Sequence, residues 1–133
     1  MKRTETEVRA TLRRLLANGP LTVLPRRAHD LEVFLTLAAA RFEPQRAYSE
    51  AQVNDLLQAW LEPFCSRFSV DHVTVRRCLV DARLLLRDRA GSTYKLAADP
   101  LSVAIGVEPA TIMVEVQRER KARKRAHSAR PGR

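Results

Sequence analysis

Apolar side chains recur every three or four residues in four stretches of the chain, and this spacing predicts four amphipathic helices. Proline, glycine and capping residues at the ends of these stretches indicate where each helix begins and ends. The first helix follows Thr4 and ends at 18–20, the second runs from about Ala28 to Phe42, the third follows Ser49 and ends at Pro63, and the fourth runs from Asp71 to about Arg83.

Three of these helices begin with a capping pattern. Thr4 is followed three residues later by Glu7, and this is the spacing of a capping box, in which two side chains satisfy free backbone N–H groups reciprocally. Ser49 and Gln52 have the same spacing. Asp71 is a suitable N-cap for the fourth helix, because its carboxylate can accept a hydrogen bond from the first turn.

Two short apolar stretches follow the fourth helix, with Gly91 and Ser92 between them, and this pattern predicts a β-hairpin. A very short strand at 46–48 is expected to pair with the hairpin and close a three-stranded sheet. From residue 28 the order is therefore helix, short strand, helix, helix, hairpin. The predicted fold class is α+β, mainly helical: a winged helix-turn-helix with an extra N-terminal helix and a basic C-terminal extension.

The 133 residues are enough for one hydrophobic core, and charge divides the chain unevenly. Of the net charge of +9, the last seventeen residues contribute eight basic side chains against one acidic, whereas 21–98 contribute eleven against nine. We expect a short helix to begin at Pro109, with a strand as the alternative, and the end of the tail to be disordered. The expected parts are an N-terminal amphipathic helix at 1–20, a winged-helix domain at 21–98, an apolar segment at 99–116 and a basic tail at 117–133.

Several classes of protein are disfavoured by what the sequence lacks. No apolar run approaches the roughly 18 residues of a membrane span, so we expect a cytoplasmic protein with no membrane partner. Cys65, Cys78 and three scattered histidines do not have the spacing of a metal site or a catalytic pair. Phosphate-binding glycine loops and nucleophile elbows are absent as well. We therefore expect no enzymatic activity, no cofactor and no small-molecule substrate.

Four segments resemble a bacterial family catalogued as domain of unknown function two thousand and eighty-seven. They are LP at 24–25, RFEPQRAYSEAQVNDLL at 41–57, DHVTVRRCLVDARLLLRD at 71–88 and GSTYKL at 91–96. The resemblance covers about residues 21–97, and it implies a winged helix of the kind found behind helix-turn-helix segments in transcriptional regulators. Family members usually carry glycine where this chain has Arg83, and they usually end the last strand on Tyr-Trp-Arg, where this chain has Tyr-Lys-Leu at 94–96.

The fourth helix is expected to present one face to the core and one to solvent. Its core face is formed by Val75, Cys78, Leu79 and Ala82, widened by Val73 and Val80. Thr74, Arg77 and Asp81 then point outward. In a DNA-binding winged helix this face enters the major groove, where Arg77 is suited to guanine and Thr74 to a base edge or a phosphate. Asp81 can pair with Arg77 one turn earlier and repels phosphates.

The remaining basic residues have different expected roles. Arg76 falls within the apolar arc, so a structural salt bridge to Glu50 or Asp55 on the preceding helix is favoured over a phosphate contact. The hairpin offers three candidate DNA contacts, although a basic tip also keeps strand edges from pairing. These are Arg87, Arg89 and Lys95, with Asp88 reducing the charge. The tail adds candidates for sequence-independent binding, namely Arg118, Arg120, Lys121, Arg123, Lys124 and Arg125.

These residues predict a winged-helix protein that binds double-stranded DNA and regulates transcription. The alternative is a winged helix used for protein interaction, including a homodimer, with a tail that binds nucleic acid non-specifically. Its motivation is the nearly neutral central region, and its contact surface would be formed by Val73, Val80 and the segment 101–116.

Overall fold

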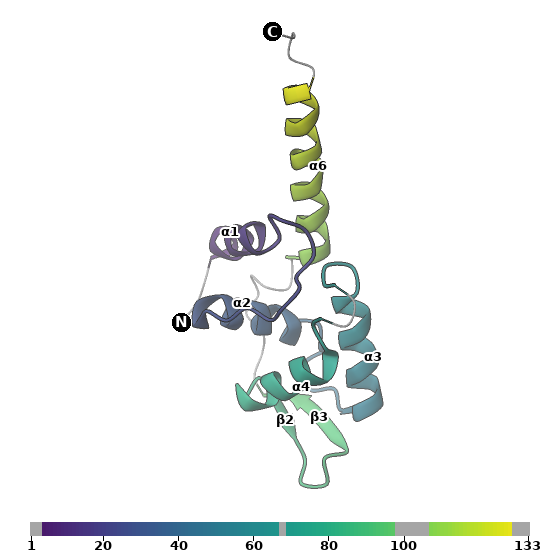
Figure 1. Ribbon diagram of the computed structural model, residues 1–133. Coiled ribbons are helices and arrows are strands. Elements are labelled where there is room, and N and C mark those ends of the chain that lie inside the picture. Colours follow the sequence, from purple (N-terminus) through teal and green to yellow (C-terminus); the bar gives the residue numbers. More distant parts are fainter. Residues whose placement is uncertain (1–3, 67–68, 98–106, 129–133) are drawn as a thin grey trace.

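The computed structural model describes residues 4–66, 69–97 and 107–128 of the chain. The protein is α+β and mainly helical, with one small sheet, as the sequence predicted (Figure 1). The elements, in chain order, are α1 (Glu5–Leu15), α2 (Ala28–Ala39), β1 (Tyr48–Ser49), α3 (Glu50–Leu61), α4 (His72–Asp81), β2 (Leu85–Arg87), β3 (Thr93–Leu96) and α6 (Pro109–Ser128). None of the helices in these ranges combines the length and apolar character of a membrane span.

The sheet has three antiparallel strands in the order β1-β3-β2, so the short strand pairs with the hairpin as expected. Tyr48 of β1 faces Tyr94 of β3, and Leu85 of β2 faces Leu96 of β3. All four of these side chains are buried, because they lie on the face of the sheet that covers the core. The first strand occupies 48–49 instead of 46–48, a shift of the size that is usual for element ends.

All three predicted N-caps are present. The Thr4 hydroxyl accepts a hydrogen bond from the backbone N–H of Glu7, and the Asp71 carboxylate accepts one from Val73. Ser49 and Gln52 form the complete capping box, with both side chains bonded to backbone N–H groups. These local contacts set the first residues of α1, α3 and α4.

The core lies between α2, α3, α4 and the sheet. Its centre is an aromatic cluster in which the Phe34 ring lies 5.6 Å from that of Trp60 and 6.2 Å from that of Phe64, measured between centroids. Trp60 and Phe64 are 4.9 Å apart in an edge-to-face arrangement. Because these rings come from α2, from α3 and from the turn after α3, they join the helices that support α4.

Helices α1 and α6 form a second layer over α2 (Figure 1). Val8, Leu12 and Leu16 of the α1 region are buried, as are Ile112 and Val116 of α6. A two-pronged ion pair joins the layers: Nη1 and Nη2 of Arg14 lie 3.1 Å and 2.5 Å from the two carboxylate oxygens of the buried Asp30.

Helix α6 begins at Pro109, where proline is favoured because the first helical N–H needs no partner. It continues through the basic segment to Ser128, for a total of 20 residues. The residues 129–133, for which the sequence predicted disorder, lie outside the described part of the chain, as do 98–106 of the apolar segment.

The end of α4 differs from the sequence prediction. Ala82 was expected on the core face, but the helix ends at Asp81 and Ala82 is its exposed C-cap. The N–H of Arg83 donates a hydrogen bond to the carbonyl of Val80 at 3.0 Å. The N–H of Leu84 donates one to the carbonyl of Leu79 at 2.9 Å. This is a Schellman motif, which requires a left-handed residue at the position of Arg83. Arg83 has φ 62°, so an arginine occupies a conformation that favours glycine.

We predict that Arg83→Gly stabilises the protein. The left-handed conformation carries a steric penalty for a side chain that glycine lacks, partly offset by the greater chain entropy of unfolded glycine, so the unfolding free energy should rise by about 0.5 to 1 kcal/mol. Urea denaturation measures this change in unfolding free energy as a shift of the unfolding midpoint, provided that the dependence of the free energy on urea concentration is unchanged. Arg83→Ala keeps the Cβ and is the control: an equal gain in both variants would show that arginine, and not the backbone conformation, is responsible.

We predict that Asp30 contributes to the loss of stability in acid. The hydrogen bond from Arg14 holds the pKa of the Asp30 carboxyl below its usual range. A carboxyl whose pKa is depressed by folding stabilises the protein above its unfolded pKa of about 3.9, and this contribution disappears as pH falls through the folded pKa. Asp30→Asn should therefore lower the unfolding free energy at neutral pH and flatten its decline below about pH 4.

The measurement is urea denaturation at a series of pH values. Asp55→Asn is the matched control, because Asp55 is exposed and makes no ion pair or side-chain hydrogen bond with a described residue. The same acid profile in both variants would contradict the assignment to Asp30.

Candidate nucleic-acid interface

Helix α4 has one face in the core and one in solvent. Val75 and Leu79 are completely buried, and Cys78, Val73 and Val80 are half-buried beside them. Thr74, Arg77 and Asp81 are exposed, as the helical spacing predicted. The polar face is therefore presented outward by a helix whose opposite side is anchored in the core.

The exposed face is partly occupied by its own contacts. The Thr74 hydroxyl donates to the Asp71 carboxylate at 3.4 Å, which orients Thr74 toward the start of the helix. Arg77 makes no ion pair or side-chain hydrogen bond with any described residue, so the pairing with Asp81 that its spacing allows is not formed. The Arg77 guanidinium is thus the cation on this face that remains available to a ligand.

Arg76, one residue earlier, is held inside the domain. Its side chain is 13% exposed, with Nη1 2.5 Å from Oδ1 of Asn54 and Nη2 3.5 Å from Oε1 of Glu50. The guanidinium also lies 5.9 Å from the centre of the Tyr94 ring, whose hydroxyl donates to the same Glu50 oxygen at 3.3 Å. Glu50 is one of the two acids expected as a partner, whereas the other, Asp55, makes no ion pair with a described residue.

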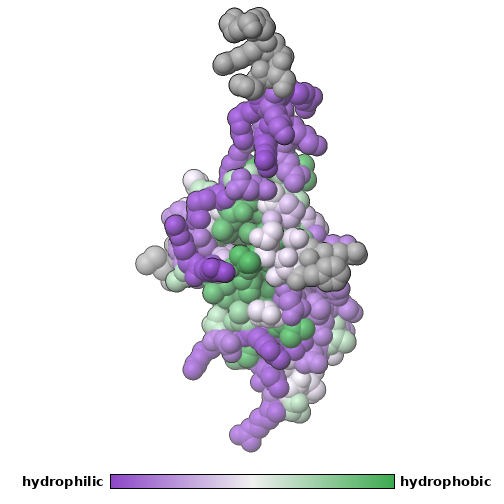
Figure 2. All heavy atoms as spheres, in the orientation of Figure 1, coloured by the Kyte–Doolittle hydropathy of each residue, from purple (hydrophilic) through white to green (hydrophobic). Residues whose placement is uncertain are grey.

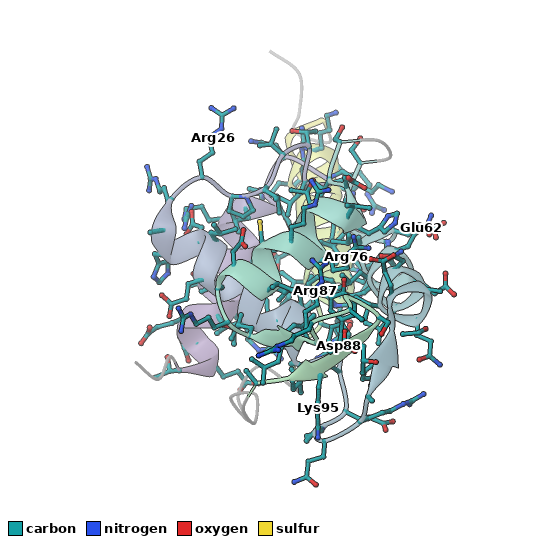
Figure 3. All side chains as sticks on the ribbon, turned by 90° about the horizontal axis from the view of Figure 1, so that it is seen from below. Arg26, Glu62, Arg76, Arg87, Asp88 and Lys95 are labelled. Atoms are coloured by element: carbon teal, nitrogen blue, oxygen red, sulfur yellow. The ribbon has the colours of Figure 1, made fainter. Side chains whose placement is uncertain are left out.

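We call these four residues, Glu50, Asn54, Arg76 and Tyr94, the Arg76 cluster. It joins α3, α4 and β3, and Figure 3 shows Arg76 between the two helices. The charge of Arg76 is satisfied inside the cluster, where a guanidinium can use several donors in a fixed plane. Arg76 therefore positions α4 and is not placed to contact a ligand.

The tip of the hairpin is organised by Asp88. Its carboxylate accepts hydrogen bonds from the backbone N–H of Ser92 at 2.8 Å, the Ser92 hydroxyl at 3.1 Å and the N–H of Thr93 at 3.2 Å. The bond from the Ser92 N–H is the main cause of a lowered pKa at Asp88. Sequence reasoning considered only the charge of Asp88, although an Asp ahead of a Gly-Ser turn is a known signal for a local side-chain-to-backbone bond.

The three basic residues of the hairpin are exposed, and Arg87 is the most constrained of them. Its guanidinium lies over Gly91, where an added Cβ would stand 2.6 Å from Nη2. Gly91 also has φ 71°, so the turn needs glycine for its backbone conformation, whereas the exposed Arg87 side chain can move away from an added Cβ. Arg89 and Lys95 have no partner among the described residues, and Lys95 projects away from the hairpin in Figure 3.

The basic residues of the tail lie elsewhere. In Figure 1, α6 rises from the α1 layer, whereas the hairpin is at the opposite end of the molecule. Helix α4, which carries Thr74 and Arg77, packs on β2 of the hairpin, whereas the basic segment of α6 lies at the other end of the molecule.

A pocket of about 720 Å³ lies where the end of α3 meets the start of α4. It is lined by Gln58, Leu61, Glu62, Cys65, Ser66, Val70, Asp71 and His72. Burial raises the pKa of the Cys65 thiol to about 12, so this thiol is protonated at neutral pH and is a poor nucleophile. The described residues contain no group of three or more His, Cys, Asp and Glu side chains that could hold a metal ion.

Comparison with known families gives one match. The family described as "Uncharacterized protein conserved in bacteria (DUF2087)" matches residues 20–96, which is more than half of the chain and confirms the resemblance seen in the sequence. The matched range contains α2 through β3 and excludes α1 and α6. Neither the curated proteins nor the solved structures gave a significant match.

We predict that Arg76 and Arg77 differ sharply in their effect on stability. Arg76→Ala removes a half-buried cation and leaves Glu50 and Asn54 without their partner, which should lower the unfolding free energy by about 1 to 3 kcal/mol. Arg77→Ala changes an exposed side chain and should stay within about 0.5 kcal/mol. Urea denaturation of both variants is the test, and similar losses in the two would contradict the division between a positioning and an exposed arginine.

Proposed function

The chain belongs to the bacterial family of uncharacterized conserved proteins DUF2087, and from this membership and the geometry of α4 we propose that it is a winged-helix protein that binds double-stranded DNA and regulates transcription. In this proposal α2, α3 and α4 are the three helices, α4 is the recognition helix, and the β2–β3 hairpin is the wing. The function is binding, without an enzymatic step.

The exposed, unpaired guanidinium of Arg77 is the observation on which the proposal chiefly rests. A recognition helix needs a face fixed in the core and an opposite face with free hydrogen-bond donors. Val75 and Leu79 provide the first, and Arg77 provides the second, next to an exposed Thr74 whose hydroxyl donates to Asp71. Arginine can donate two hydrogen bonds to O6 and N7 of guanine, a pattern that distinguishes this base in the major groove.

The position of α4 relative to the core supports the same proposal. Recognition depends on a helix that keeps its orientation when it meets DNA, because a misplaced donor loses its base contact. The Arg76 cluster supplies this rigidity by joining α4 to α3 and β3. The two neighbouring arginines therefore serve different purposes: Arg76 sets the orientation and Arg77 contacts the base.

The hairpin is suited to the DNA backbone. Arg87, Arg89 and Lys95 place three cations on it, all of them exposed. The carboxylate of Asp88 is engaged by three hydrogen bonds within its own turn, so it holds the tip in shape as well as reducing its charge. Contacts between such cations and DNA phosphates position a protein on the duplex without reading its sequence.

The alternative function is protein interaction, including a homodimer. Figure 2 shows apolar side chains gathered on the middle of one face, and such an area favours a protein partner. The apolar contact surface predicted from the sequence is smaller in the structure, however, because Val107, Ile112 and Val116 are buried in the core. Val73 and Val80 are half-buried, and 101–106 lie outside the described residues. We therefore place DNA binding first.

We predict that Arg77→Ala weakens binding to the preferred duplex by about 1 to 3 kcal/mol and removes the preference at one base pair. The measurement is selection from a randomised duplex pool by the full chain, followed by titration of the enriched sequence and a single-base series. Arg9→Ala on α1 is the matched control, because it removes the same charge from the layer that lies away from the hairpin.

An unchanged preferred sequence and unchanged affinity in Arg77→Ala would exclude the recognition role. A uniform loss across all sequences would show that Arg77 contacts phosphate, and α4 would then not be the reading helix. If the wild-type chain enriches no sequence at all, the alternative function is favoured.

A further inference from the structure

The projecting part of α6 is a dense cluster of positive charge. Figure 2 shows hydrophilic residues over all of its visible surface. The segment 118–126 contains six basic residues and one acid, and none of these six cations forms an ion pair with a described residue. They are Arg118, Arg120, Lys121, Arg123, Lys124 and Arg125, all exposed. We call these six residues the α6 cluster.

The direction of α6 is built into the fold. Ile112 and Val116 are buried in the core shared with α1. Arg13 of α1 pairs with Glu119 and lies 3.7 Å from Glu115, both on α6. Since α1 is itself joined to α2 by the Arg14–Asp30 pair, the first part of α6 is attached to the domain through α1. A helix of 20 residues is about 30 Å long, so its basic end lies well beyond the α1 layer.

The α6 cluster also covers most of the helix circumference. At 3.6 residues per turn its six positions occupy more than half of the circle, and Glu119, Ala122 and Ala126 share the remaining strip. Like charges three or four residues apart destabilise a helix by about 0.2 to 0.5 kcal/mol per pair, and such pairs recur throughout this segment. A polyanion along the helix would remove this repulsion.

Among polyanions, the composition of the segment favours a duplex. Residues 109–128 include no Phe, Tyr or Trp, so the helix lacks the large aromatic side chains on which single-stranded bases commonly stack. Residues 117–126 have no apolar side chain larger than alanine, so this part lacks the apolar face that inserts into a membrane surface. Duplex phosphates require only closely spaced cations, which the α6 cluster provides.

We propose that the α6 cluster binds a second DNA duplex, so that one molecule bridges two segments of DNA. One segment lies on α4 and the hairpin, as in the proposed function on which this inference rests, and the other lies along α6. The two surfaces are at opposite ends of the molecule, and the contacts of α6 with α1 direct its basic end away from the first duplex.

The test is capture of one duplex by another. A duplex with the preferred sequence of the full chain is fixed to beads, protein is bound, and retention of a labelled duplex of unrelated sequence is measured across a salt series. The test variant is Lys121→Gln with Lys124→Gln and Arg125→Gln. The control variant is Arg9→Gln with Arg26→Gln and Arg27→Gln, which removes three charges from α1 and the start of α2. Both are used as full chains, at concentrations where sedimentation shows monomers.

We expect wild-type and control proteins to retain the labelled duplex, and the α6 variant to lose at least about tenfold in retention, since three phosphate contacts also give a steep salt dependence. The α6 variant should still bind the fixed duplex within about threefold of wild type. Retention that persists in this variant, or retention found only with dimers, overturns the proposal.

Failure of the proposed function has a different signature. If Arg77→Ala has no effect and the α6 variant loses the fixed duplex as well, α6 is the only DNA contact and both proposals fall. If the α6 variant weakens binding to the fixed duplex and no protein retains a second one, α6 reaches the first duplex. In that case only the bridging proposal falls.

Discussion

Arg76 joins α4 to α3 and to β3, and the orientation of the exposed face of α4 depends on this contact. Helix α4 buries Val75 and Leu79 completely, and these apolar contacts anchor one face of the helix in the core. The guanidinium of Arg76 adds a directional hydrogen bond to Asn54 and an ion pair with Glu50, and both contacts link α4 to α3. Tyr94 extends the same network to the sheet. Arg77 lies on the exposed face of the helix that is held in this way.

A second constraint separates the two basic regions of the molecule. The Arg14–Asp30 pair fixes α1 on α2, and the contacts of Arg13 fix α6 on α1. The basic end of the chain is therefore not a loose extension that follows the hairpin to a shared ligand. Because α6 is attached to α1, its charges lie at the end of the molecule away from the sheet (Figure 1).

Features that depend on neighbouring residues were predictable. The caps at Thr4, Ser49 and Asp71 satisfy N–H groups two or three residues away, so a short pattern is sufficient to identify them. The buried face of α4 at Val75 and Leu79 follows from helical spacing in the same way. Ala82 was misplaced because α4 ends at Asp81, one residue before it. The Schellman motif at this end usually contains glycine, and here Arg83 takes that position. The structural role of Asp88 was missed because only its charge was considered, and not the turn that its carboxylate stabilises.

Local patterns along the chain were enough to predict the order of elements, the starts of the helices, the polar face of α4 and the concentration of charge near the C-terminus. Each of these is a property of residues close together along the chain. The packing of the helices was needed to show that Glu50 and not Asp55 accompanies Arg76, that Arg77 stays unpaired, and that α6 points away from the hairpin. The reason is physical: these outcomes depend on how helices distant in sequence pack against a common core, and helical spacing specifies which face is buried but not which partner it meets.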